Sequence, residues 1–188
     1  AFPLIKTGGL ADVAGALPPA LARRGIDVKL MLPAYPSVRE TAVHQREGLA
    51  LGSLLGAGET RLIEAELPGS RLPLLLVDCP AMFDRPGGPY QQPDGRDWPD
   101  NYLRFAVLSL AAVRVAAVGA NRFWRPDVVH AHDWQTGLTA AYLAHSDLQA
   151  VRSVFTVHNL RYQGIFSPEV LPSIGLPDRA LGIDGLEF

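Results

Sequence analysis

Short apolar runs alternate with helical segments along much of this chain. Strand-like runs cover residues 28–32, 127–131 and 153–157, and amphipathic helical patterns cover residues 10–21, 101–118 and 136–145. Strands that alternate with helices of this length predict βαβ units, in which helices cover both faces of a parallel sheet. The pattern therefore predicts an α/β fold built on a doubly wound, mostly parallel sheet.

The middle of the chain departs from this alternation. Three strand-like runs, at residues 49–55, 61–67 and 74–78, follow one another without a helix between them. A loop rich in proline and glycine then occupies residues 84–99, which is long for a simple connection and is therefore a functional candidate. Asp100 is predicted to cap the helix that follows. Pro18 and Pro19 are predicted to kink or break the first helix.

Composition excludes several classes of protein. Of the 188 residues, 48% are hydrophobic and 19% charged, with a formal net charge of −2, which suits one globular domain rather than a disordered chain. Lys and Arg are not in excess, so neither a nucleic acid nor a membrane surface is an expected partner. No run of roughly 20 apolar residues predicts a membrane span. The single cysteine, Cys79, excludes an internal disulfide and favours a cytoplasmic location.

The segment Lys6-Thr7-Gly8-Gly9 stands directly before the first helical pattern. Paired glycines allow a ligand to approach the backbone, and a helix start offers free N–H groups and partial positive charge. With the Lys6 ammonium beside it, this arrangement suits a phosphate or diphosphate. The alternative is a tight turn without a ligand, since neither of the well-known nucleotide-loop patterns is present.

Polar residues follow two of the predicted strands, where ligands bind in wound α/β sheets. His130 and His132 are two apart and should face the same way, so they could chelate a metal, or one could be packed and the other hydrogen-bonded. Asp133 falls at the rim where loops gather. His158 could donate to a substrate hydroxyl or act as an acid–base group, or it could be a buried histidine bonded to backbone.

Two aromatic residues of the long loop are further candidates for ligand binding, and two known catalytic motifs are absent from the sequence. Tyr90 and Trp98 could stack on sugar rings, or they could simply pin the loop that carries them. Cys79 directly follows a strand, and a packing role is favoured over that of a nucleophile. The chain has no G-x-S-x-G motif, which weakens a serine hydrolase of the α/β type. It also has no Asp-x-Asp pair, the usual metal anchor of one class of nucleotide-sugar transferases.

Taken in order, the motifs closely resemble the bacterial glycogen synthase and plant starch synthase family. They are KTGGLADV at residues 6–13, FDRPG at 83–87, DN at 100–101, WRPDVVHAHDW at 124–134, FTVHNL at 155–160, YQG at 162–164 and GLEF at 185–188. The resemblance covers essentially the whole chain. It implies a retaining glycosyltransferase of two Rossmann-like domains, which transfers glucose from ADP-glucose to the non-reducing end of an α-1,4-glucan without a metal or other cofactor.

The resemblance also assigns roles to residues. Lys6, Gly8 and Gly9 would face the donor's diphosphate and glucose, with Asp12 in the same motif also binding substrate. His158 would lie beside the reacting sugar as the catalytic residue, with Asn159 next to it.

On the acceptor side of the cleft, the resemblance places Tyr90 and Asp133. It further implies that residues 1–188 form the N-terminal, acceptor-side domain, incomplete at both ends. The family's first strand would precede Ala1, and a C-terminal domain holding most nucleotide contacts would follow as its partner. The alternatives are a stand-alone sugar- or nucleotide-binding module without catalysis, and a hydrolase or metal enzyme built on His130 and His132.

Overall fold

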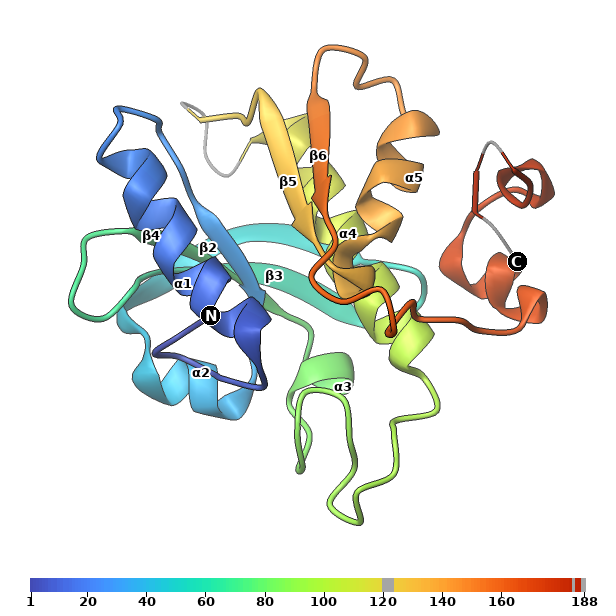
Figure 1. The fold of residues 1–188 in the computed structure, drawn as a ribbon, viewed down its shortest axis with the longest axis horizontal. Coiled ribbons are helices and arrows are strands. Elements are labelled where there is room, and N and C mark those ends of the chain that lie inside the picture. The colour runs from blue at the N-terminus through green and yellow to red at the C-terminus, as the bar shows by residue number, and fades with distance from the viewer. Residues whose placement is uncertain (120–123, 184, 187–188) are drawn as a thin grey trace.

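The computed structural model describes residues 1–119, 124–183 and 185–186 (Figure 1). The last two residues of the final motif, Glu187 and Phe188, lie outside the described residues. The elements of the described part are α1 (Gly9–Ala22), β1 (Leu30–Pro33), α2 (Pro36–Thr41), β2 (Val43–Ser53), β3 (Glu59–Glu66), β4 (Pro73–Asp78), α3 (Pro80–Phe83), α4 (Asn101–Val118), β5 (Val128–His132), α5 (Leu138–Ala144) and β6 (Arg152–Thr156), with 3-10 helices η1 (Trp134–Thr136), η2 (Pro168–Ile174) and η3 (Asp178–Ala180). The α/β class is confirmed.

The strands form two sheets. The first has the order β1-β4-β3-β2, and the second consists of β5 and β6. β1 runs parallel to β4 and β5 parallel to β6, whereas β3 is antiparallel to both β2 and β4. The sheet is thus more mixed than expected. The reason lies in the connections, since β2, β3 and β4 follow one another without a crossover helix, and short connections join antiparallel neighbours.

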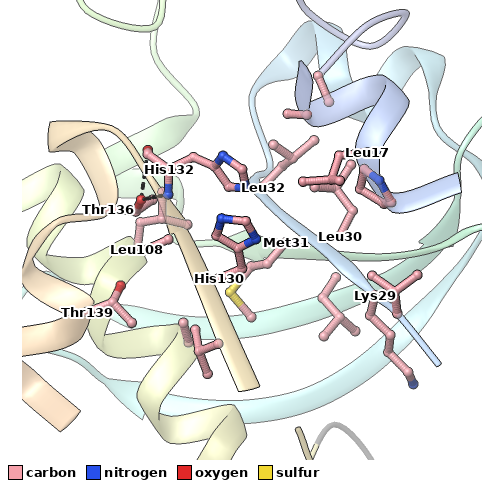
Figure 2. Close-up of a pocket in the computed structure, with 18 of the residues that line it drawn as sticks. Leu17, Lys29, Leu30, Met31, Leu32, Leu108, His130, His132, Thr136 and Thr139 are labelled. Atoms are coloured by element: carbon pink, nitrogen blue, oxygen red, sulfur yellow. Dashed lines mark hydrogen bonds between the residues drawn. The ribbon is translucent and has the colours of Figure 1, made fainter. Parts of the chain in front are cut away.

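A cavity of about 760 Å³ separates the two sheets. Among the described strands, β1 is paired only with β4 and β5 only with β6, so the free edges of β1 and β5 border this cavity. Leu30, Met31 and Leu32 line it from β1, and His130 and His132 extend into it from β5 (Figure 2). We call this space the inter-sheet cavity. The rest of its lining is largely apolar and includes side chains of α1 and α4.

Helix α1 begins at Gly9, close to the predicted start, and ends at Ala22. Of the predicted kink or break, the break does not occur, because the helix continues through Pro18 and Pro19. Both prolines fall near the C-terminal end, so only a short stretch of helix depends on the missing N–H donors. The φ that a proline ring imposes is itself close to the helical value.

Helix α4 is the central helix and has the bounds that the sequence predicts. It is long and apolar enough to meet the length and hydropathy criteria for a membrane span. Most of its side chains are nevertheless buried against the rest of the chain, and it contacts β1, α5, η1 and η2. These contacts are those of the core helix of a folded domain. Asp100 stands at its N-cap position but makes no capping bond, since its carboxylate pairs with Arg85 at 2.8 Å.

Candidate active site

The Lys6–Gly9 segment and the first turn of α1 form an open, polar surface. Gly8 has φ +148°, a backbone conformation that favours glycine, and a Cβ at Gly8 or Gly9 would meet no atom within 4 Å. Lys6 Nζ lies 2.9 Å from Asp12 Oδ1, and both side chains are more than half exposed. The structure therefore brings together four of the predicted site residues, with the ammonium held beside the free N–H groups of a helix start.

The end of β5 carries a strained turn. Asp133 is buried and has φ +61°, which is uncommon for a residue other than glycine. Its N–H donates to the carbonyl of Thr156 at 2.8 Å, so the turn is tied to the end of the neighbouring strand β6. Strain of this kind persists where surrounding structure holds it, and it gathers at functional sites. The predicted position of Asp133 at a loop-lined rim is consistent with this geometry.

Three histidines form a connected cluster beside this turn, which we call the histidine ladder: His130, His132 and His158. The rings of His130 and His132 stack with centroids 4.1 Å apart, which confirms that they face the same way. His130 Nε2 lies 2.8 Å from Thr156 Oγ1, and His132 Nδ1 lies 3.0 Å from His158 Nε2. Within the described residues, no group of three or more histidine, cysteine or acidic side chains could hold a metal.

The surroundings of the two histidines on β5, His130 and His132, favour their neutral form. Burial, together with the nearby His130 and His158 rings, lowers the pKa of His132 to about 4. Burial, followed by the effect of His158, also lowers the pKa of His130. Both shifts favour the neutral imidazole, because desolvation and like-charge repulsion each penalise the protonated ring. A neutral imidazole can donate one hydrogen bond and accept another, which a doubly protonated ring cannot do.

We expect the free energy of unfolding to fall as pH drops from about 6.5 to about 4, since the unfolded chain then binds a proton that folded His132 refuses. His132 contributes a decrease on the order of 1–2 kcal/mol to the free energy of unfolding, a value reduced to allow for its partial exposure. Urea titrations at several pH values measure it. In the His132→Asn variant the free energy of unfolding should decrease less steeply with falling pH than in the wild type. In the His145→Asn variant, which changes an exposed residue, it should decrease as steeply as in the wild type. Equal slopes in all three proteins would contradict this expectation.

The long loop positions Tyr90 against the end of β5. The Tyr90 ring packs near Phe105 and Trp134, with centroids 5.9 Å and 6.3 Å away. Its hydroxyl accepts a hydrogen bond from Gln135 Nε2 at 3.0 Å, and its carbonyl accepts one from Asn101 Nδ2 at 2.9 Å. Tyr90 is therefore held at both its backbone and its side chain, and it lines the inter-sheet cavity together with Gln135.

Arg104 holds this loop in place, a role that the sequence does not predict. It is 1% exposed, and its guanidinium donates to the carbonyls of Met82 and Pro89 at 2.8 and 3.0 Å and to Asn101 Oδ1 at 2.7 Å. Burial lowers its pKa. The guanidinium thus joins the start of the loop, the residue before Tyr90 and the first turn of α4. Nothing in its sequence spacing signals these backbone partners.

Trp98 and Cys79 have structural surroundings. The Arg85 guanidinium lies over the Trp98 ring, 4.9 Å from its centroid. This contact is within the loop, which agrees with the interpretation that Trp98 pins the loop that carries it. Cys79 is fully buried, and its thiol lies 3.6 Å from the carbonyl of Ala57. The packing role expected for Cys79 fits this burial. Asn159, in contrast, is exposed, and its side chain accepts a bond from the N–H of Arg161 within a turn.

The inter-sheet cavity brings three sequence-distant regions together. Its lining includes Thr7 and Leu10 from the start of α1, Tyr90 from the long loop, and His132 at the end of β5. Lys6 lies next to this lining in the chain, and His158 contacts it through His132. Of the predicted site residues, Tyr90 lines this cavity and His158 reaches its lining through His132, whereas Lys6, Gly8, Gly9, Asp12, Asp133 and Asn159 are not part of the lining.

Comparison with known proteins matches the whole chain to one family. The family model of the starch synthase catalytic domain matches residues 1–188. The chain is 51% identical to a glycogen synthase of Rhodospirillum rubrum and 49% identical to one of Rhizobium etli, in each case over 100% of this chain. It covers only 39% and 38% of those two proteins.

A solved structure is also similar. The catalytic domain of starch synthase IV from Arabidopsis thaliana, bound to ADP and acarbose, superimposes with a TM-score of 0.76 at 28% sequence identity. The match covers 95% of this chain and 36% of the plant one. Likeness of fold and of sequence therefore extends along nearly the entire chain.

Proposed function

The chain belongs to the starch synthase catalytic-domain family, and on this premise we propose that it forms the acceptor-side domain of an enzyme that transfers glucose from ADP-glucose to the non-reducing end of an α-1,4-glucan. The observation that carries the proposal is the open start of α1, where Lys6 lies 2.9 Å from Asp12 and the backbone at Gly8 and Gly9 is unobstructed. The relatives are more than twice as long as this chain, so the reaction is assigned to a protein of their length that contains these residues. We call it the family-length protein.

The donor is proposed to bind at the start of α1. Its diphosphate carries negative charge that increases on the departing ADP as the glycosidic bond breaks. The free N–H groups around Gly8 and Gly9, the helix dipole and the Lys6 ammonium all stabilise such charge. The ADP bound in the Arabidopsis structure supports a donor that carries this nucleotide.

The acceptor is proposed to bind along Tyr90 and Asp133. The Tyr90 hydroxyl accepts a hydrogen bond from Gln135 and its backbone carbonyl accepts one from Asn101, and an aromatic face held in this way suits a sugar ring. Asp133 is fixed by its bond to Thr156 and could accept from a sugar hydroxyl. His158 and Asn159 follow the carboxyl end of β6, and we propose that they lie between donor and acceptor. The acarbose of the Arabidopsis structure supports a glucan-like ligand.

The inter-sheet cavity is proposed to be filled in the family-length protein by the strand expected before Ala1. The free edges of β1 and β5 face this cavity, and both strands would be parallel neighbours of a strand placed there. Its apolar lining matches the side chains of a central strand, which is buried on both faces. Such a strand would join the two sheets into one.

Lys6→Ala in the family-length protein is expected to weaken donor use. A charge-assisted hydrogen bond to phosphate contributes about 1.5–3 kcal/mol, which corresponds to roughly tenfold or more in kcat/KM for ADP-glucose. Steady-state kinetics at saturating glycogen measure the loss. Arg23→Ala, an exposed cation just past the other end of α1, is the matched control and should leave the kinetics unchanged. Unaltered donor kinetics in folded Lys6→Ala protein would remove Lys6 from the diphosphate site.

His158→Ala in the same protein is expected to lower kcat more than it raises the KM for acceptor. A group beside the reacting sugar acts mainly in the transition state, and losing one hydrogen bond there costs roughly tenfold or more. The control is His145→Ala, at an exposed position after α5. If only the KM for the acceptor rose, His158 would belong to the acceptor subsites and not to the reaction centre.

A further inference from the structure

Helix α1 carries a glycine near its middle, at a position where the helix alone would favour alanine. Gly15 lies well inside α1, which runs from Gly9 to Ala22. Glycine inside a helix is less favourable than alanine, because more backbone freedom is lost on folding. Gly15 is not among the described residues that line the inter-sheet cavity. A glycine at this position therefore indicates a constraint from outside the helix.

The constraint comes from the backbone of residues 1–5, which lie beside α1 (Figure 1) and which we call the N-terminal turn. A Cβ added at Gly15 would lie 2.5 Å from the carbonyl oxygen of Phe2 and 3.3 Å from its backbone C and N atoms. All three are backbone atoms, so no side-chain rotation relieves the overlap. A carbon and an oxygen in contact normally stand about 3.3 Å apart or more, so a methyl group here requires the two backbones to separate by roughly 1 Å.

Hydrogen bonds make the N-terminal turn compact and fasten it to α1. The N–H of Phe2 donates to the carbonyl of Ala11 at 2.9 Å, one helical turn before the glycine and on the same face of the helix. The N–H of Ile5 donates to the carbonyl of Ala1 at 3.0 Å, which closes the turn. A displacement at Phe2 is therefore passed on to Ile5, the residue directly before Lys6.

Lys6 contacts both the N-terminal turn and α1. Its Nζ lies 5.9 Å from the centre of the Phe2 ring and 2.9 Å from Asp12 Oδ1. Because Phe2 belongs to the turn and Asp12 to the helix, the separation of these two elements determines where the ammonium stands. The same segment continues directly to Gly8 and Gly9, where the diphosphate of the donor is proposed to bind.

We propose that Gly15 is a positioning residue for the donor site, because its missing side chain allows the N-terminal turn to rest on α1 and so fixes the place of Lys6 and of the backbone at Gly8 and Gly9. Gly15 acts through the turn and not by contact with the donor. The role in donor binding rests on the proposed function, whereas the contact between the turn and α1 is a property of the chain itself.

The stability of the 188-residue chain tests this contact. Helix propensity alone predicts that Gly15→Ala raises Tm, whereas the overlap with Phe2 predicts that Tm falls by roughly 3–8 °C. Gly9→Ala is the control for stability, since a Cβ at that position meets no atom within 4 Å, and it should not lower Tm. A Tm that is not lowered in Gly15→Ala overturns the proposal.

Binding of ADP to the family-length protein gives a readout that needs no turnover. Calorimetric titration should show that Gly15→Ala binds ADP about tenfold more weakly, because a displacement of about 1 Å at a site can have an effect of this size or larger. Ala16→Ser is the matched control, since it adds one atom at an exposed position of the same helix, and it should bind ADP as the wild type does. Binding of a maltooligosaccharide should be unchanged in both variants, which a general loosening of the domain would not produce.

Phe2→Ala keeps the proposal testable even if Gly15→Ala fails to fold. The Phe2 side chain is 56% exposed, so its loss should not unfold the protein. It removes the ring beside Lys6 Nζ and should weaken ADP binding about threefold. In a Lys6→Ala background it should cause no further loss, because its effect passes through Lys6. Unchanged ADP affinity in Phe2→Ala and in folded Gly15→Ala contradicts the proposal.

Kinetics of the family-length protein separate this proposal from the proposed function. Gly15→Ala should lower kcat/KM for ADP-glucose about tenfold and leave the KM for glycogen unchanged. If the wild type binds ADP but transfers no glucose, the proposed function fails, and the ADP affinities of the variants still decide the positioning role. An increase confined to the KM for glycogen would place the effect of Gly15 on the acceptor side and would overturn the proposal.

Discussion

Replacing Arg104 with methionine is expected to destabilise the chain by about 3 kcal/mol or more, because three hydrogen bonds to a charged, buried group are lost at once. The carbonyls of Met82 and Pro89 and the side-chain oxygen of Asn101 would each lose a donor in a site that water does not reach freely. Methionine fills a similar volume, so the loss reports on polar contacts rather than on a cavity. Urea unfolding followed by circular dichroism measures it.

The matched control is Arg114→Met, on the same helix α4 but with an exposed side chain. A surface change of this kind should alter stability by no more than about 0.5 kcal/mol. Arg104→Lys should fall between the two, since a lysine keeps the charge but cannot reproduce the guanidinium fork. A loss below about 1 kcal/mol in Arg104→Met would mean that other contacts hold the Tyr90 loop.

The 188-residue chain by itself is expected to show no measurable glucose transfer from ADP-glucose to glycogen. Holding donor and acceptor in a reactive orientation can contribute about 7–11 kcal/mol to the acceleration, or several orders of magnitude in rate. The chain spans 39% of the Rhodospirillum rubrum relative, and the α1 start supplies only part of the donor contacts that the family is expected to use. The assay is incorporation of labelled glucose into glycogen by the purified chain.

Two controls make that expectation informative. Near-ultraviolet circular dichroism shows whether the chain is folded, and the family-length protein at equal concentration shows whether the assay works. Weak binding of ADP or of a maltooligosaccharide by the chain would agree with the proposed sites. Turnover close to that of the family-length protein would show that the catalytic machinery lies entirely within these residues.

Local patterns in the sequence were enough to predict most elements. The helix at residues 101–118 has the predicted bounds, because its long apolar run and preceding Asp100 are local signals. The strands β1, β3, β4, β5 and β6 were found within two residues at each end, and β2 was placed six residues too late at its start. The short, helix-free connections between β2, β3 and β4 already favour antiparallel neighbours, so the prediction of a mostly parallel sheet is too general for this part of the chain.

The candidate site was predictable where it depends on short patterns within one segment of the sequence. Lys6, Gly8, Gly9 and Asp12 do lie together at a helix start, and His130 and His132 do share a face. The link from His132 to His158 required the parallel register of β5 and β6, which no local pattern gives. The role of Arg104 is not predictable either, since two of its three hydrogen-bond acceptors are backbone carbonyls, which any sequence carries.

Glucose transfer by the family-length protein tests the central claim most directly. Labelled ADP-glucose and UDP-glucose are each supplied with glycogen, and the new linkage is identified by its sensitivity to an enzyme that cleaves only α-1,4 bonds. We expect α-1,4-linked incorporation from ADP-glucose, reduced roughly tenfold or more by Lys6→Ala and by His158→Ala and unaffected by His145→Ala. Incorporation that is absent with both donors, or that is unchanged in the Lys6 and His158 variants, would contradict it.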